Sequence, residues 1–583
     1  MKFKKFSVVL SMSLAIIMSV SLIGCSKSSS TATESTKVDS STAPAAVTSD
    51  APAPTAAAVA NDCTLKLWGF KFNQSIDSPG VQTDPVSKEI ERVVGCKIEL
   101  YPQESEDLFS TKLASGDMPD VMGVNRKFVQ KLLDAKAVLP LDELVKQAPN
   151  VSQFDKMLNF DKEFLSDADH KLYFITRAPE DYTLNLDVGM YLRWDYYKEL
   201  GSPPVNNVDD YIKVLSDMVK KHPTNDKGKK VYGLSPWFDW GMWSWTTPGY
   251  LNGMWNNGLI DYDMADNMKP LSVVTNENSS YWTTIDLFYK AKKAGILDPD
   301  SFTQKFDNSI QKGRDLQVVG GLGNFWFSDP NKVFKDAGEN KGFMAIPPKE
   351  GTKARWGGYW QPLGADSHYA ISSKTKYPEQ AMKLYNYLYS VEGSRTINNG
   401  IKGKDWDDAG GKLTVTPEAL KTIDDKDAEI KTGIRRYKDI FPGLPENFRG
   451  EYTNLFKLPE FTINNYSPLE KEYYAELGVT GAADLLQKRV ENKVANTAVL
   501  LLRPLQPDDL KRIDDKIMDY MLKAAVKVVL AKDDAEYAEL KQKTIEDIKG
   551  MDFDKSWKYW EGITSTISDY IAKNDLNRNP DTK

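Results

Sequence analysis

Residues 63–124 alternate between strand patterns and helix patterns, and this alternation limits the fold more than any other feature. The segments CTLKLWGFKF (63–72), CKIELYPQ (96–103) and DMPDVMGV (117–124) are typical of strands. The two segments between them, 84–95 and 105–116, carry apolar residues at helical spacing. A β-α-β-α-β order predicts a parallel sheet with right-handed crossovers, and therefore an α/β fold.

The chain has 583 residues, which is too many for one hydrophobic core of ordinary size. Strand-like pieces such as KGFMAIPP (341–348) and HYAISSK (368–374) lie between helical segments, and a long helical region extends to about Lys573. This pattern predicts a second α/β lobe, with the chain crossing between the lobes more than once. No internal repeat occurs at a fixed period.

The N-terminus predicts export. A basic start, MKFKKF, precedes an apolar stretch, and residues 1–24 together read as a signal peptide. The stretch ends in Leu-Ile-Gly-Cys25, which resembles a bacterial lipobox, where the cysteine receives a diacylglyceryl group and becomes the first mature residue. The alternative is an uncleaved anchor helix, which would also leave the rest of the chain outside the membrane. We expect residues 25–61, rich in Ser, Thr, Ala and Pro, to be a disordered tether.

Composition excludes several classes of function. A net charge of −7 argues against a nucleic-acid groove, which needs a basic face. The three cysteines and three scattered histidines do not form a zinc motif. Cys63 and Cys96 precede the first two strands, so neighbouring parallel strands would bring them together as a disulfide, although two buried free thiols are equally compatible with the sequence.

Several segments resemble one family in their order and spacing, from about Leu65 to Ala572. They are SGDMPDVM (115–122), YLRWDYYKELGSPPVNNVDDYIKVLSDM (191–218), KKAGILDPDSF (292–302), KGRDLQVVGG (312–321), AISSKTKYPEQAMKLYNYLYSVEG (370–393) and GIKGKDWDDAGGKLTVTPE (400–418). This set is similar to the family 1 extracellular solute-binding proteins of bacterial ABC importers, and in particular to large lipoproteins that bind complex oligosaccharides.

The resemblance implies a type II periplasmic-binding-protein-like fold, with two hinge-linked α/β lobes and a helix-rich C-terminal region. It also implies that a sugar binds between the lobes, which close over it and present it to the transmembrane subunits of a permease. We expect residues 62–175 with about 315–375 in lobe 1, about 176–314 with 376–573 in lobe 2, and a flexible tail over 574–583.

A sugar site needs aromatic rings for the apolar C–H faces and polar groups for the hydroxyls. Residues 235–258 contain four tryptophans within nine residues, and their glycines and proline predict a loop. Two smaller clusters lie at 321–329 and 355–364. The expected ligand-binding residues are Trp237, Trp240, Trp243, Trp245, Trp326, Trp356, Tyr359 and Trp360, with Asp117, Glu180, Arg193, Asp239, Asn324 and Gln361 as polar partners.

Each of these tryptophans has an alternative role in core packing, and we expect Trp240, Trp243, Trp326 and Trp360 to be the stacking rings. Arg193 and Asp117 have an alternative role in closing a lobe or capping a loop.

Many relatives carry a calcium loop where this chain has HPTNDKGKKVYG (222–233). Calcium takes six to eight oxygen ligands, and this stretch offers few carboxylates beside three lysines. We therefore expect no metal and no cofactor.

The competing class is a secreted glycoside hydrolase or polysaccharide lyase, which needs two carboxylates across a cleft. No nucleophile elbow, His-Glu-x-x-His motif or P-loop occurs in the chain. A third class, an adhesive surface protein, has no repeats to support it. The sequence therefore predicts a binding protein and not an enzyme: a monomer, lipid-anchored on the extracellular face of the membrane, that binds oligosaccharides and no nucleic acid.

Overall fold

The computed structural model describes residues 63–68, 79–101, 105–179, 184–266, 268–353, 355, 357–423, 425–438, 440–491 and 494–576. The predicted signal peptide, Cys25 and the tether lie outside these residues, as does most of the predicted tail. Among the helices within these ranges, none combines the length and apolar character that crossing a membrane requires.

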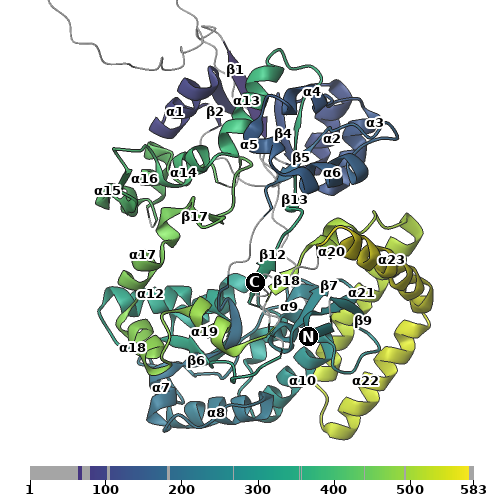
Figure 1. The fold of residues 1–583 in the computed structure, drawn as a ribbon. Coiled ribbons are helices and arrows are strands. Elements are labelled where there is room, and N and C mark those ends of the chain that lie inside the picture. The colour runs from purple at the N-terminus through teal and green to yellow at the C-terminus, as the bar shows by residue number, and fades with distance from the viewer. Residues whose placement is uncertain are drawn as a thin grey trace, which may run out of the picture. The chain divides into compact units, whose positions relative to one another are not determined.

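A six-stranded sheet contains the predicted β-α-β-α-β unit (Figure 1). Its strand order is β2-β3-β1-β4-β13-β5. The three strands predicted from the alternation pair in parallel, and β13 runs antiparallel to both of its neighbours. The strands are β1 (Thr64–Trp68), β2 (Gly80–Val81), β3 (Lys97–Leu100), β4 (Val121–Val124), β5 (Ile175–Arg177) and β13 (Ala365–Ile371).

The two connecting helices begin and end at residues that cap them. In α1 (Pro85–Val94), the Asp84 side chain accepts a hydrogen bond from the Ser87 amide, and Gly95 ends the helix with a φ of 88°. In α2 (Glu106–Ser115), Ser105 and Gly116 have the same roles. Capping residues visible in the sequence therefore determine where these helices start and stop.

A second, three-stranded sheet has the order β10-β6-β11. Here β10 (Gly320–Gly323) and β11 (Phe343–Ala345) both pair antiparallel with β6 (Val188–Arg193). The expected division placed 315–375 in lobe 1, and these pairings correct it for residues 320–345. Short apolar strands such as these fit either sheet, so the sequence alone could not decide their partner.

The helices after β13 also differ from the expected division. Helices α13 (Pro378–Leu388) and α14 (Val391–Asn399) pack with the six-stranded sheet, and the Tyr385 hydroxyl donates to the Ala370 carbonyl over 3.1 Å. Buried residues as far along the chain as Phe456 belong to the same core. The segment after residue 376 therefore contributes to both cores and not only to lobe 2.

The second core contains β6, β10, β11 and most of the later helices. Figure 1 shows α21, α22 and α23 as a helical group at the C-terminal end of the chain. The longer helices not yet given are α6 (Asp155–Phe164), α8 (Val208–Lys221), α10 (Ser280–Lys293), α11 (Phe306–Arg314), α12 (Ser328–Asp336), α18 (Pro468–Glu476), α19 (Ala482–Arg489), α21 (Asp508–Val529), α22 (Asp534–Lys549) and α23 (Phe553–Lys573). The predicted helix-rich C-terminal region is confirmed.

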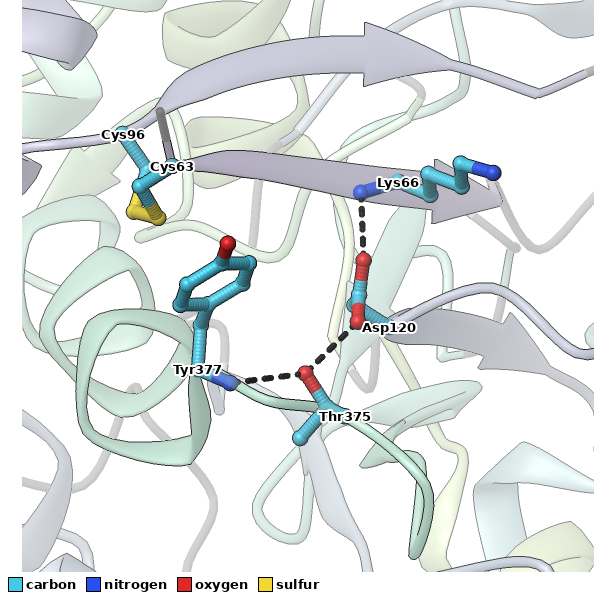
Figure 2. The surroundings of a disulfide bond; sticks show 6 residues. All are labelled: Cys63, Lys66, Cys96, Asp120, Thr375 and Tyr377. Atoms are coloured by element: carbon cyan, nitrogen blue, oxygen red, sulfur yellow. Dashed lines mark hydrogen bonds between the residues drawn. A yellow bond between two sulfur atoms is a disulfide. The ribbon is translucent and has the colours of Figure 1, made fainter. Parts of the chain in front are cut away.

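Cys63 and Cys96 form a disulfide where β1 and β3 begin, with their Cα atoms 4.7 Å apart (Figure 2). Both residues are buried, at 5% and 1% exposure. On the other side of β1, the Asp120 carboxylate accepts hydrogen bonds from the Lys66 amide over 2.9 Å and from the Thr375 hydroxyl over 2.6 Å. The first strand is therefore attached covalently to β3 and by a carboxylate to the turn before α13.

A buried carboxylate links α6 to β5. Asp161 is fully buried, accepts a hydrogen bond from the Thr176 amide over 3.0 Å, and is bonded to the Thr176 hydroxyl. Burial raises the pKa of Asp161 to about 8, although the bonds from Thr176 act in the opposite direction. The side chain is therefore mostly protonated at neutral pH.

This shift makes stability depend on pH. Between about pH 4 and pH 8 the folded protein keeps the Asp161 proton that the unfolded chain has lost, so the contribution of Asp161 to the free energy of unfolding falls as pH rises, by up to about 1.4 kcal/mol per pH unit. The full contribution of Asp161 to the free energy of unfolding is present only below about pH 4, the pKa of this side chain in the unfolded chain. We expect Asp161→Asn to flatten urea-unfolding stability across this range, and Asp155→Asn, an exposed change on the same helix, to leave the slope unchanged. Equal slopes in Asp161→Asn and the wild type would contradict the assignment.

Candidate ligand-binding site

The tryptophan-rich segment is folded into two short helical pieces. Helix α9 spans Met242–Thr246 and the 3-10 helix η2 spans Thr247–Asn252. The predicted loop is therefore wrong for these residues. Gly241 and Gly253 have φ values of 61° and 74°. They mark the two ends of the helical stretch and do not interrupt it.

Six aromatic side chains form one patch, which we call the aromatic patch. The ring of Trp237 lies 4.8 Å from those of Phe306 and Trp326, and the ring of Trp240 lies 4.4 Å from that of Phe306. Trp240 also packs against the ring of Trp243 at 5.1 Å. The members of the patch are Trp237, Trp240, Trp243, Phe306, Phe325 and Trp326.

The rings differ in exposure, and this separates a surface layer from a supporting layer. Trp240 is 42% exposed, whereas Trp237 and Trp326 are 2% and 7% exposed. The indole N–H groups of Trp237 and Trp326 are buried and have no hydrogen-bond partner in the described part of the chain. The Trp240 ring is therefore exposed to solvent, while the buried Trp237 packs against it and Trp326 packs against Trp237.

Trp245 packs inside the core. Its side chain is 1% exposed, and its ring stacks on Phe238 with the centroids 3.9 Å apart. Phe302 packs nearly parallel to both rings, with its centroid 5.5 Å from that of Phe238 and 6.5 Å from that of Trp245. This corrects the expected ligand contact of Trp245, because a ring covered in this way leaves no face for a sugar.

Three residues near the patch were not among the expected ligand-binding residues. Phe306 and Phe325 complete the patch from α11 and from the 3-10 helix η5 (Asn324–Trp326). Asp187, just before β6, is exposed, and its carbonyl accepts a hydrogen bond from the Asn324 amide over 2.9 Å. Phe325 stood inside a tryptophan cluster in the sequence, but no sequence signal linked Phe306 to the patch.

The expected polar partners beside the patch are Asp239 and Asn324. Asp239 is exposed, and one carboxylate oxygen accepts a hydrogen bond from the Phe306 amide over 3.0 Å. The side chain of Asn324 is also exposed. An aromatic face bordered by a carboxylate and an amide is the chemistry that a neutral sugar ring needs.

A second aromatic surface lies on β12 (Gly358–Trp360), which pairs in parallel with β18 (Val494–Asn496). Tyr359 is 41% exposed, and its ring centroid lies 6.1 Å from that of the buried Trp255. Trp360 and Gln361 follow it and are half-buried. These three stay as predicted ligand contacts, and Trp356 lies outside the described residues.

The remaining expected residues do not join the patch. Arg193 is 4% exposed and forms a two-point ion pair with Asp195, at 2.9 and 2.6 Å. The guanidinium is thus paired within its own segment, and its role in ligand binding or in closing a lobe stays a prediction. Asp117 is exposed at the end of α2, 3.4 Å from the Lys112 ammonium. Glu180 lies outside the described residues.

Lysine side chains pair residues 222–233, the stretch that replaces the relatives' calcium loop, with the Asp315 carboxylate. Lys227 and Lys229 approach the Asp315 carboxylate at 3.4 and 3.2 Å. The Asn225 side-chain oxygen accepts hydrogen bonds from the backbone amides of both lysines. Three oxygens that would suit a cation, both of Asp315 and the side-chain oxygen of Asn225, are thus already used by donors of the protein.

We expect calcium to have no effect at this loop. Millimolar calcium and excess EDTA should leave the melting temperature and the ligand affinity unchanged, because lysine ammonium groups repel the ion. Differential scanning fluorimetry tests this, with a known calcium-binding protein treated in parallel. A calcium-dependent rise of several degrees would contradict the expectation.

The six-stranded sheet, the second sheet and the repeated chain crossings define the class, a two-lobed solute-binding protein. An extracellular solute-binding protein from Bifidobacterium longum subsp. infantis has this fold, with a TM-score of 0.58 and 18% identity over 87% of this chain and 98% of its own. A Streptococcus pneumoniae ABC-transporter substrate-binding protein, solved with kestose, gives a TM-score of 0.55 and 15% identity over 88% of this chain and 100% of its own.

Sequence comparison identifies the family. The model of the bacterial extracellular solute-binding proteins matches residues 81–394, and the chain belongs to this family. Lipoprotein LipO of Bacillus subtilis is 22% identical over 395 residues, which cover 60% of this chain and 69% of that protein.

Proposed function

We propose that this protein binds an oligosaccharide at the aromatic patch and delivers it to the transmembrane subunits of an ABC importer. The observation that carries the proposal is the exposed ring of Trp240, which packs against the buried Trp237 and lies next to Asp239 in the chain. Kestose in the pneumococcal structure is a sugar ligand on the same fold, which supports a sugar here. We further propose that the lobes close over the ligand and that Trp243, Tyr359, Trp360 and Gln361 contribute contacts.

We also propose that the protein is a lipoprotein, attached through Cys25 and held near the outer membrane face by residues 26–61. The lipobox-like Leu-Ile-Gly-Cys motif supports this, as does the lipoprotein name of the Bacillus relative. Mass spectrometry of the mature N-terminus tests the anchor. A mature chain that starts at any residue other than a lipidated Cys25 would contradict it.

A binding function without catalysis is the third part of the proposal, since the family and the similar structures are binding proteins. Purified protein should be incubated with a panel of oligosaccharides, followed by fluorimetry and product analysis. We expect a rise in melting temperature, because ligand binding to the folded state stabilises it, with the sugar recovered intact. Released reducing ends or unsaturated products would support a hydrolase or lyase instead.

A further inference from the structure

A small polar cavity lies in the lobe that contains the six-stranded sheet, and none of the expected ligand-binding residues lines it. Its volume is about 140 Å³, and its wall comes from the end of β5, from α14, from Lys438 and from residues 441–446. The lining residues are Arg177, Ile397, Asn398, Lys438, Phe441, Gly443, Leu444 and Glu446.

Two cations in this wall have no partner within the described part of the chain. Arg177 and Lys438 are both half-buried, and neither side chain forms a hydrogen bond or ion pair with a described residue. Some other cations of this protein are paired with carboxylates, as Arg193 is with Asp195 and Lys312 is with Asp298. Two unpaired positive charges facing one small cavity repel each other and favour an anion between them.

Glu446 is the one carboxylate among the described lining residues, and it is already engaged. Glu446 accepts a hydrogen bond from the Asn454 side chain over 2.9 Å, and the Lys457 ammonium lies 3.9 Å from its other oxygen. Lys457 offsets the charge of Glu446. The charges of Arg177 and Lys438 therefore give the cavity a local positive charge. The whole chain carries a net charge of −7, so attraction of an anion here comes from these local groups and not from the overall field.

The rest of the wall matches a sugar ring. Asn398 is 8% exposed, and its amide nitrogen donates to the Ser394 carbonyl over 2.9 Å, which directs the amide and leaves its oxygen as an acceptor for a hydroxyl. Phe441, Ile397 and Leu444 also line the cavity but are almost fully buried, so its surface is mostly polar. The volume is of the order of one monosaccharide ring.

We propose that this cavity binds a carboxylate-bearing sugar residue, with Arg177 and Lys438 holding the carboxylate and Asn398 accepting a hydroxyl hydrogen bond. Arginine and lysine form strong charge-assisted bonds with carboxylates, while a neutral hexose leaves both cations unpaired. The inference rests on the proposed sugar-binding function and deepens it, because it gives the ligand of this protein an acidic residue. Free small anions share the carboxylate chemistry but lack the hydroxyl whose hydrogen bond Asn398 accepts in this proposal.

The test compares each uronate with its neutral hexose. Glucuronate, galacturonate and mannuronate, and glucose, galactose and mannose, are titrated into the full mature protein by calorimetry at constant ionic strength, with acetate and sulfate as simple anions. We expect at least one uronate to bind about tenfold or more tightly than its neutral counterpart and than acetate or sulfate. Equal binding of uronate and hexose, or of uronate and acetate, would overturn the proposal.

Variants assign the binding to this cavity. Arg177→Gln and Lys438→Met should each weaken uronate binding by about tenfold, Arg177→Lys by less, and Lys421→Met, an exposed change in the same lobe, should have no effect. Each variant is first checked for an unchanged melting curve. Uronate affinity that persists in both Arg177→Gln and Lys438→Met would place the anion elsewhere and reject the cavity.

The two proposals fail in different ways. If neutral oligosaccharides bind in a Trp240-dependent manner while no uronate is preferred, the acidic-residue inference fails and the proposed function stands. If no sugar, neutral or acidic, binds the wild-type protein, the sugar-binding function fails as well.

Discussion

Replacing Trp240 by alanine should weaken oligosaccharide binding by about ten- to a hundredfold, or about 1–3 kcal/mol. Trp240 is 42% exposed without ligand, so a sugar that stacks on it removes apolar ring surface from water. The ring is held by Trp237 and Phe306, at centroid distances of 5.3 and 4.4 Å, which reduces the ordering cost of binding. Isothermal titration calorimetry with the best oligosaccharide of the panel measures the loss.

Two further variants separate stacking from a general loss of structure. Trp240→Phe keeps an aromatic face and should retain most of the affinity. Trp557→Ala removes a half-buried tryptophan that stacks near Phe553 on α23, away from the patch, and should leave affinity unchanged even if stability falls. Unchanged binding in both Trp240→Ala and Trp360→Ala would show that the sugar binds elsewhere.

Removing the disulfide should lower the free energy of unfolding by about 3–4 kcal/mol. Cys63 and Cys96 are 33 residues apart in sequence, so the bond restricts a sizeable loop in the unfolded chain. It also attaches β1, an inner strand of the sheet, to the start of β3. Cys63 is the first residue that the structure describes. Urea unfolding of the Cys63→Ala/Cys96→Ala variant measures the effect, since alanine adds no polar group to these buried positions.

Reduction gives the matched control. Dithiothreitol should lower the stability of the wild-type protein towards that of the double variant and leave the variant itself unchanged. Sugar affinity should be retained in the folded variant, because the disulfide is not part of the aromatic patch. Equal stability of variant and wild type under oxidising conditions would mean that the bond adds nothing to this fold.

The local chemistry of the chain was sufficient to predict the first α/β unit. Strand alternation and helical spacing both act within a few residues, and the structure confirms the elements that they predict. Capping and periodicity are short-range effects, so they can be read without knowledge of the fold. The possible disulfide was also visible, although the sequence left the alternative of free thiols open.

Strand partners could not be read in the same way. Residues 320–323 and 343–345 are short and apolar, and only their contact with β6 places them in the second sheet. The helices after residue 376 are amphipathic whichever core they cover. Only tertiary packing shows that α13 and α14 belong to the core of the six-stranded sheet. Pairing depends on residues more than a hundred positions away, which no local pattern records.

The candidate site shows the same division. Sequence determined that tryptophans concentrate in residues 235–258, that the chain has few metal ligands, and that it resembles sugar-binding proteins. Tertiary structure decided which rings reach the surface: Trp240 does, Trp245 does not, and Phe306 joins them from a distant helix. Exposure is a property of everything packed around a side chain, and it is set only when segments far apart in sequence come together.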